Sequence, residues 1–273
     1  MKKLFFPAIL CIAVSANAQK HQLVKLWETD TVINVPESVL PDLNKNILYV
    51  SLIEGGGWDA DGNGGVGILS MSGKIIDTTF ITGLNAPKGL GKFGDRLYAA
   101  DLNEVVVIDI SKRKVEKKIP IPDASGLNDI TVSNKGIVYV SDSKTSKIWK
   151  IQNDHPTLFL DNINGANGLK CIGNDLIFAE GKDLKKADAN KKISSIATVT
   201  ADIDGIEPIG NGDFIVTSWA GYIYYVHANG KVETLLETHD QKINSADIGY
   251  NPEKKIVYVP TFLHKTIAAY KLK

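Results

Sequence analysis

Residues 127–151, LNDITVSNKGIVYVSDSKTSKIWKI, contain the pattern that indicates the fold. A short element that ends on an aliphatic residue, Asn128-Asp129-Ile130, opens a β-branched run, and a second run, Val138-Tyr139-Val140, follows it. The turn sequence Asn134-Lys135-Gly136 separates the two, and a third run, Lys147-Ile148-Trp149, comes next. Apolar runs of this length with turn residues between them predict short antiparallel strands.

The same element recurs six times along the chain: Glu37-Ser38-Val39, Lys88-Gly89-Leu90, Asn128-Asp129-Ile130, Asn167-Gly168-Leu169, Asp204-Gly205-Ile206 and Ala246-Asp247-Ile248. Successive elements begin 51, 40, 39, 37 and 42 residues apart. Each is followed by a second strand-like run: 47–50, 97–100, 138–140, 176–179, 214–216 and 257–259. A period of about 40 residues with three or four short strands is typical of a β-propeller.

We therefore predict an all-β fold, a six-bladed β-propeller that forms one domain over residues 19–273. The last unit has room for only three strands, and the leftover strand lies at the other end of the chain, within His21 to Ile33. We expect this N-terminal strand to complete the last blade, which would cover an otherwise open sheet edge. A large β-sandwich is the competing fold, but a sandwich does not repeat one element six times.

Residues 1–18 have the pattern of a cleaved secretory signal peptide. Lys2-Lys3 is positively charged, Leu4 to Val14 is apolar, and Ala16-Asn17-Ala18 matches a cleavage site. We expect a periplasmic or secreted protein, without a membrane span because the apolar run is too short. A lipid anchor at Cys11 is the minor alternative, since the residues before it make a poor attachment context.

Composition excludes several classes of function. The chain has 31 basic and 31 acidic residues, whereas nucleic-acid binding requires a basic excess or a basic face. No phosphate-binding loop and no nucleophile-elbow serine occur. After signal cleavage Cys171 alone remains, so no intramolecular disulfide forms, and its strand-like setting predicts a small buried hydrophobe in place of a reactive thiol.

The first residues of the six elements are the main candidates for function. In a propeller the innermost strands line the central channel, so these residues should form a ring: Glu37, Lys88, Asn128, Asn167, Asp204 and Ala246. Four of them offer carboxylate or amide oxygens, which suit a hard cation such as calcium, magnesium or manganese. The absence of histidine from the ring argues against an imidazole-based zinc site.

A second candidate for calcium lies in the first unit, where Asp59, Asp61 and Asn63 match the first half of a calcium-loop pattern. The twelfth position of that pattern is Ser70, where a bidentate glutamate is required. We therefore favour a Gly- and Asp-rich hairpin on the surface of the blade.

These motifs resemble the gluconolactonase, regucalcin and senescence-marker family of six-bladed propellers, which are similar in turn to the paraoxonases. The resemblance runs from Glu37 to the C-terminus and is strongest at the motifs 37–40, 127–129, 166–169 and 203–205. It implies that Glu37, Asn167 and Asp204 hold a catalytic divalent metal, with Asn128 as a fourth ligand or a substrate contact. Calcium is the favoured ion, with magnesium, manganese or zinc as alternatives.

The reaction that the resemblance implies is hydrolysis of a sugar lactone or similar ester, in which the metal polarises the carbonyl and Asp204 helps to activate water. The chain departs from the pattern at Lys88, which either pairs with a ring carboxylate and competes with the metal, or binds the substrate as an electrophile. A histidine base of the paraoxonase type has no counterpart among His155, His227, His239 and His264.

Ends of the second runs should return to the same face: Asp101, Asp142, Glu180, Trp219 and Thr261. We interpret the aspartates as caps of the turns that follow them. A sugar ring could stack on Trp219 while Glu180 binds its hydroxyl groups. Glu207, three residues past Asp204, should point away from the channel and be a surface or blade-packing residue.

Two functions remain open from the sequence. The first is a metal-dependent lactonase or esterase with a small lactone or sugar-like substrate, with Asp204 and Lys88 in catalytic roles. The second is a non-catalytic propeller that binds a small ligand or a partner protein on its channel face, which an ion pair of Lys88 with Glu37 or Asp204 would favour. In either case we expect a monomer.

Overall fold

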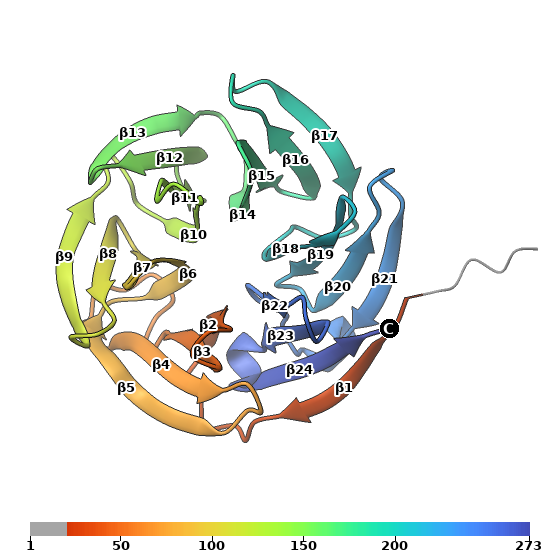
Figure 1. The fold of residues 1–273 in the computed structure, drawn as a ribbon, viewed down its shortest axis with the longest axis horizontal. Helices are drawn as coiled ribbons and strands as arrows, with labels where there is room; N and C mark the ends of the chain where they lie inside the picture. Colours follow the sequence, from red (N-terminus) through yellow and green to blue (C-terminus); the bar gives the residue numbers. More distant parts are fainter. Residues whose placement is uncertain (1–20) are drawn as a thin grey trace, which may run out of the picture.

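The computed structural model describes residues 21–273, so the predicted signal peptide lies outside the described residues. Six four-stranded antiparallel sheets stand around a central channel like the blades of a propeller, which confirms the predicted fold (Figure 1). In each sheet one strand faces the centre and the others follow outward to the rim.

Blades 1 to 6 are numbered in chain order. Blade 1 contains β2 (Pro36–Asp42), β3 (Ile47–Leu52), β4 (Gly64–Ser70) and β5 (Ile75–Leu84). Blade 2 contains β6 (Pro87–Phe93), β7 (Arg96–Asp101), β8 (Glu104–Asp109) and β9 (Lys114–Pro120). Blade 3 contains β10 (Leu127–Val132), β11 (Val138–Asp142), β12 (Lys147–Gln152) and β13 (His155–Leu160).

Blade 4 contains β14 (Ala166–Ile172), β15 (Asp175–Glu180), β16 (Asp183–Ala187) and β17 (Ile193–Thr198). Blade 5 contains β18 (Ile206–Gly210), β19 (Asp213–Ser218), β20 (Tyr222–Val226) and β21 (Val232–Glu237). Blade 6 contains β22 (Gly249–Asn251), β23 (Ile256–Pro260), β24 (Ile267–Leu272) and β1 (Leu23–Glu28). The short 3₁₀ helices η1 (His239–Gln241) and η2 (Phe262–His264) lie in loops, and no helix of residues 21–273 has the length and apolar character that crossing a membrane requires.

The ring of blades closes through the N-terminal strand, as predicted. β1 pairs antiparallel with β24, from Leu23 opposite Leu272 to Glu28 opposite Ala268, and forms the outer edge of blade 6 (Figure 1). The first and last segments of the described chain therefore share one sheet, and each of the six hydrophobic clusters lies between two adjacent blades.

A β-bulge in the innermost strands directs the ring residues into the channel. In blades 1 to 4 the register with the second strand shifts at the same place, between Pro36 and Val39 in β2, for example. The ring residue lies inside each bulge, where the chain is released from regular pairing and a side chain can be re-aimed. The bulge is thus the local reason that Glu37, Lys88, Asn128 and Asn167 share one direction.

Buried hydroxyl groups hold the backbone next to three of the ring residues, in blades 1, 3 and 5. Ser51, Ser141 and Thr217 occupy equivalent positions in the second strands and accept the backbone N–H of Ser38, Asp129 and Gly205, each at 2.9 Å. These are the residues that follow Glu37, Asn128 and Asp204, so each hydroxyl fixes the chain next to a ring residue. We call Ser51, Ser141 and Thr217 the clasp residues.

Blades 2 and 4 have alanine at the clasp position and instead rely on glycine after the ring residue. A Cβ at Gly89 would lie 2.6 Å from the Cα of Asp129, and one at Gly168 would lie 2.1 Å from the carbonyl oxygen of Asp204. Real Cβ contacts do not reach these distances, so glycine is required for neighbouring blades to approach this closely at the axis.

Candidate functional site

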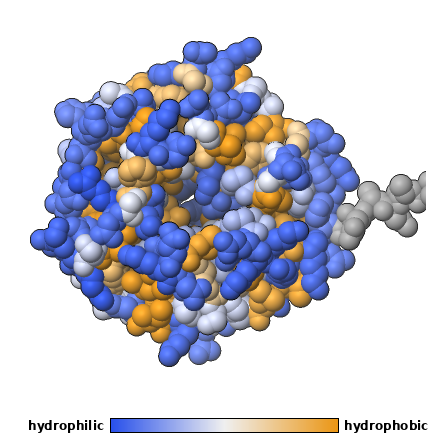
Figure 2. Space-filling view, in the orientation of Figure 1, coloured by the Kyte–Doolittle hydropathy of each residue, from blue (hydrophilic) through white to orange (hydrophobic). Residues whose placement is uncertain are grey.

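The predicted ring forms the floor of a cavity at one end of the channel. The cavity has a volume of about 310 Å³, and its lining includes Glu37, Lys88, Asn128, Asn167 and Asp204. A volume of about 300 Å³ or more is typical of small-ligand sites. The space-filling view is hollowed at its centre, where the channel opens (Figure 2). Ala246 is fully buried and does not line the cavity.

Two buried oxygen atoms in this ring have no partner among residues 21–273: Oε2 of Glu37 and Oδ1 of Asn167. The nitrogen atoms of the ring amides are engaged elsewhere, because Asn167 Nδ2 donates to Asp204 Oδ1 at 2.9 Å and Asn128 Nδ2 donates to Ser143 Oγ at 3.0 Å. The amide oxygens are therefore the atoms available to a ligand. A buried acceptor without a donor costs about 1–3 kcal/mol, which a cation or a donor from a ligand would relieve.

Lys88 does not form the ion pair that the sequence left open. Within the described part of the chain, no ion pair within 4.0 Å joins Lys88 to Glu37 or Asp204. Its Nζ donates to the carbonyl oxygen of Gly57 at 2.8 Å and lies 4.3 Å from the centre of the Trp58 ring. The ammonium is thus held by Gly57 and Trp58, and it lines the cavity without forming an ion pair with either carboxylate.

Burial shifts the pKa of all three charged ring residues toward their neutral forms. Desolvation raises the pKa of Asp204 to about 6, against the hydrogen bond from Asn167, which lowers it. Desolvation, with the nearby charge of Asp204, raises the pKa of Glu37 well above its ordinary value. The pKa of Lys88 is lowered by desolvation, although the carboxylates oppose this. Glu37 and Asp204 also repel each other when both are ionised, so a cation next to these two carboxylates would be favourable.

Three aromatic side chains form the walls above the ring: Trp58, Trp219 and Phe262. Trp219 was predicted from the sequence, and it meets Phe262 edge-on at 5.6 Å between ring centres. Trp58 and Phe262 were missed. Trp58, Trp219 and Phe262 all lie in loops between the second and third strands of their blades. An aromatic residue in the same loop of three units is the sequence signal that would have identified Trp58 and Phe262.

The loop that carries Trp58 belongs to the channel mouth and not to the blade surface where we expected it. Lys88 and Lys144 both lie 4.3 Å from the Trp58 ring centre, one from blade 2 and one from blade 3. These contacts, together with the Lys88–Gly57 hydrogen bond, fold the glycine-rich segment 54–63 over the cavity.

Glu180 does not line this cavity, because its carboxylate is paired with Lys185 Nζ at 2.5 Å on the same blade. The prediction that the second-strand aspartates cap the turns after them is confirmed for Asp142 and wrong for Asp101. Asp142 accepts the N–H groups of Lys144 and Thr145 in the turn that follows, whereas Asp101 caps a preceding segment by accepting those of Asn85 and Ala86.

A second layer of charge lies deeper in the channel, and here the expectation for Glu207 was wrong. Glu207 is buried, lines the narrow channel and pairs with Lys170 at 2.8 Å. Asp247 in the same layer accepts from Ser38 Oγ at 2.5 Å, and Asp129 accepts the N–H of Leu169 at 2.5 Å.

Cys171 lies at the edge of a wider groove of about 360 Å³ between blades 3 and 4, which contains none of the ring residues. Cys171 is half-buried, and not fully buried as its strand-like setting predicted. Burial raises the pKa of its thiol to about 11, which disfavours the reactive thiolate.

No protein-family model matches the chain, and no curated protein matches it. Solved structures share its fold. A streptogramin B lyase aligns with a TM-score of 0.66 at 13% identity, over 93% of this chain and 97% of the other. A nidogen/laminin complex aligns with a TM-score of 0.67 at 16% identity, over 80% of this chain and 85% of the other.

A third structure is a catalytically inactive variant of virginiamycin B lyase from Staphylococcus aureus with quinupristin. It aligns with a TM-score of 0.64 at 16% identity, over 93% of this chain and 99% of the other. At these identities the likeness shows a shared fold alone, the six blades are seen in this chain's own sheets, and the gluconolactonase-like resemblance stays a prediction.

Proposed function

We propose that the channel mouth is the active site of a divalent-metal-dependent hydrolase that opens a sugar lactone or a related ester. The observation that carries the proposal is the pair of buried, partnerless oxygens on Glu37 and Asn167, which face a cavity of small-molecule size. Oxygen atoms without donors are what a hard cation requires.

The residues present fit a divalent ion. Glu37, Asn167 and Asp204 would hold it, with Asn128 as a fourth ligand or a substrate contact, and calcium is favoured because every donor is an oxygen. When bound, such an ion polarises the substrate carbonyl. The three charged ring residues sum to −1 when ionised, so a divalent ion would leave the site at +1, which suits an anionic substrate or a developing oxyanion.

The chain's own groups have separable roles. Asp204 is positioned to take a proton from water, and the amide of Asn167 orients it through the 2.9 Å hydrogen bond to Oδ1. Lys88, held by the Gly57 carbonyl, presents its remaining N–H groups to a substrate oxygen. Trp219 and Phe262 offer apolar faces on which a sugar ring can pack, whereas the Trp58 ring is already in contact with Lys88 and Lys144. Glu180, being paired with Lys185, has no part in this site.

The test uses chelator-stripped protein to which calcium, magnesium, manganese or zinc is returned. An ion that binds only the folded state raises the melting temperature, and we expect that rise with at least one ion and lactone hydrolysis with the same ion. Asp204→Asn should abolish hydrolysis, and Glu37→Gln should abolish the thermal shift. Asp161→Asn, on an exposed loop, is the matched control. Hydrolysis that survives Asp204→Asn would refute the proposal.

The second candidate is a binding propeller without catalysis. It is favoured by one observation, the position of Lys88 between Gly57 and Trp58, which places an amine on the cavity wall. Binding of an anionic sugar without turnover, lost in Lys88→Met, would select it. For either function we propose a monomer that acts in the periplasm or outside the cell.

A further inference from the structure

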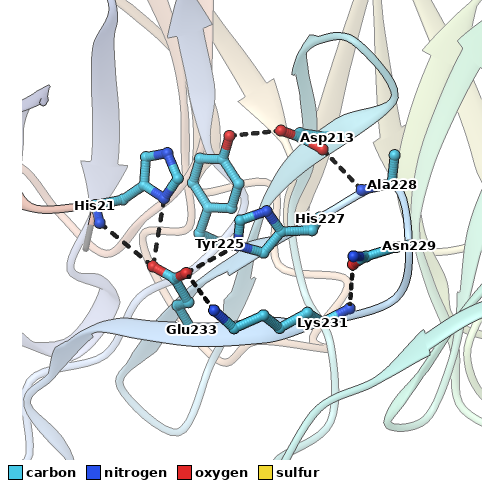
Figure 3. A network of polar contacts seen from close by, with 8 residues as sticks. All are labelled: His21, Asp213, Tyr225, His227, Ala228, Asn229, Lys231 and Glu233. Carbon is cyan, nitrogen blue, oxygen red and sulfur yellow. Dashed lines mark hydrogen bonds and ion pairs between the residues drawn. The ribbon is translucent and has the colours of Figure 1, made fainter. Parts of the chain in front are cut away.

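Three metal-ligand side chains meet on the outside of the propeller, where the N-terminal segment passes blade 5. His21 precedes β1, His227 follows β20 and Glu233 lies on β21 (Figure 3). His21 Nδ1 lies 3.3 Å from Glu233 Oε2, and His227 Nε2 lies 2.8 Å from Glu233 Oε1. The two imidazoles thus approach the two oxygens of one carboxylate.

The spacing of these atoms suits one small metal ion. One ligand atom from each residue lies within 4.8 Å of the others. A zinc ion bound tetrahedrally at about 2.0–2.2 Å holds neighbouring ligand atoms about 3.4 Å apart. That spacing matches the 3.3 Å between His21 Nδ1 and Glu233 Oε2, and the 2.8 Å between His227 Nε2 and Glu233 Oε1 would widen when an ion enters. Two histidines and one glutamate are a ligand set that zinc uses, with water completing the fourth position.

The side chains are oriented before any ion arrives. The His21 ring stacks on Tyr225 at 3.7 Å between centres and 11° between planes, and the hydroxyl of Tyr225 donates to Asp213 at 2.6 Å (Figure 3). Asp213 also accepts the N–H of Ala228 at 2.7 Å, which fixes the turn after His227. Such supporting contacts position ligands and so raise metal affinity.

Burial and charge leave room for an ion. The Glu233 side chain is 10% exposed, whereas His21 and His227 are 29% and 24% exposed, so one side of the cluster is open to water. Lys231 Nζ lies 3.2 Å from Glu233 Oε1, but its side chain is 57% exposed and can swing into solvent. Lysine is therefore a weak competitor that an ion can displace.

We propose that His21, His227 and Glu233 bind a single divalent transition-metal ion, of which zinc is the representative, and that this ion ties the N-terminal segment to blade 5. β1 closes the ring of blades by pairing with β24. A second attachment just before β1 opposes the release of this closing strand. The site is independent of the channel mouth, which has oxygen ligands only and no histidine among its described lining residues.

The experiment is a zinc titration of the full chain, prepared without a polyhistidine tag, with cobalt as the spectroscopic probe. We expect one equivalent bound, visible cobalt absorption, and a rise in melting temperature with zinc. Loss of even an outer partner of a metal ligand weakens affinity about 10- to 100-fold, so His227→Gln and Glu233→Gln should each weaken binding by at least about tenfold. Unchanged affinity in both variants would overturn the proposal.

Matched variants separate this site from the channel and from a structural role. His155→Gln removes an exposed histidine elsewhere and should leave the affinity unchanged. The zinc titration is repeated with the Asp204→Asn protein, which is altered at the channel mouth. If zinc binding is lost in Asp204→Asn but kept in His227→Gln, zinc binds at the channel mouth; that result contradicts the site proposed here and leaves the proposed function intact. Lys231→Met removes the lysine that competes with the ion for Glu233, so zinc binding should tighten by up to about fivefold, which corresponds to the free energy of an exposed lysine–carboxylate pair. Weaker zinc binding in Lys231→Met would contradict the role given to Lys231.

Discussion

Thr217 is the clasp residue whose removal should be felt both in stability and in the channel. Its Oγ1 accepts the N–H of Gly205 at 2.9 Å and donates to the carbonyl oxygen of Ala246 at 2.8 Å, so it joins blades 5 and 6. The backbone of Thr217 also accepts the N–H of Asp204 at 2.8 Å. The side chain is fully buried, so water cannot replace the hydroxyl.

Thr217→Val keeps the shape of the side chain and removes both hydrogen bonds. A buried N–H left unpaired costs about 1–3 kcal/mol and a lost hydroxyl bond about 0.5–1.5 kcal/mol, so we expect a loss of about 3 kcal/mol. For a chain of this size that corresponds to a fall of about 6–12 °C in melting temperature. Because Gly205 follows Asp204, metal affinity at the channel mouth should fall as well.

Calorimetry and chemical denaturation in chelator measure the stability, and a metal titration measures the site. Thr217→Ser keeps the hydroxyl and should restore most of both. Thr157→Val is the matched control, because Thr157 is exposed on β13 and donates to Lys150 at 3.2 Å. A Thr217→Val protein within about 0.5 kcal/mol of the wild type, the range of ordinary surface changes, would refute the role of the clasp.

Two further predictions concern charge in the channel. Lys88→Met removes the cation that faces Glu37 and Asp204, so calcium should bind more tightly in a direct titration. Turnover of the lactone should fall in the same variant. Weaker calcium binding would show instead that Lys88 stabilises the ring. Burial raises the pKa of Asp247 to about 7 from an ordinary 3.8, so the folded state holds this proton more tightly than the unfolded state. Stability should therefore decline as pH rises from about 4 to 7 in chelator, and Asp247→Asn should flatten that decline in denaturation curves; parallel curves for the two proteins would contradict it.

The repeat made the fold and most of the ring predictable. Equivalent residues of a closed set of blades must occupy equivalent places around the axis, so six aligned elements were enough to bring Glu37, Asn128 and Asp204 together. The positions of the clasp residues are also visible in the sequence, because Ser51, Ser141 and Thr217 directly follow the second runs of their units. Their function was not, because the bulge that brings each hydroxyl to a backbone N–H is set by the pairing of two strands.

The sequence predicted the loops less well than the strands. The sequence favours a surface hairpin for segment 54–63 and a sugar contact for Glu180. The structure differs in both places because lysines that are distant in the sequence, or on a neighbouring strand, contact these residues. Lys88 and Lys144 draw Trp58 over the channel, and Lys185 takes the Glu180 carboxylate away from it. Cation–π contacts and ion pairs depend on distances in space, which strand periodicity does not encode.

The sequence by itself determined the number of blades, the strand that closes them and the ring of oxygen donors, because all three follow from a repeat and from the alternation of side chains along strands. Only the tertiary structure decided what surrounds the ring and where histidines meet. His21 and Glu233 are 212 residues apart in the chain and lie in contact solely because closure lays the N-terminal segment against blade 5. Contacts of that kind arise from the packing of whole blades, and no local pattern specifies them.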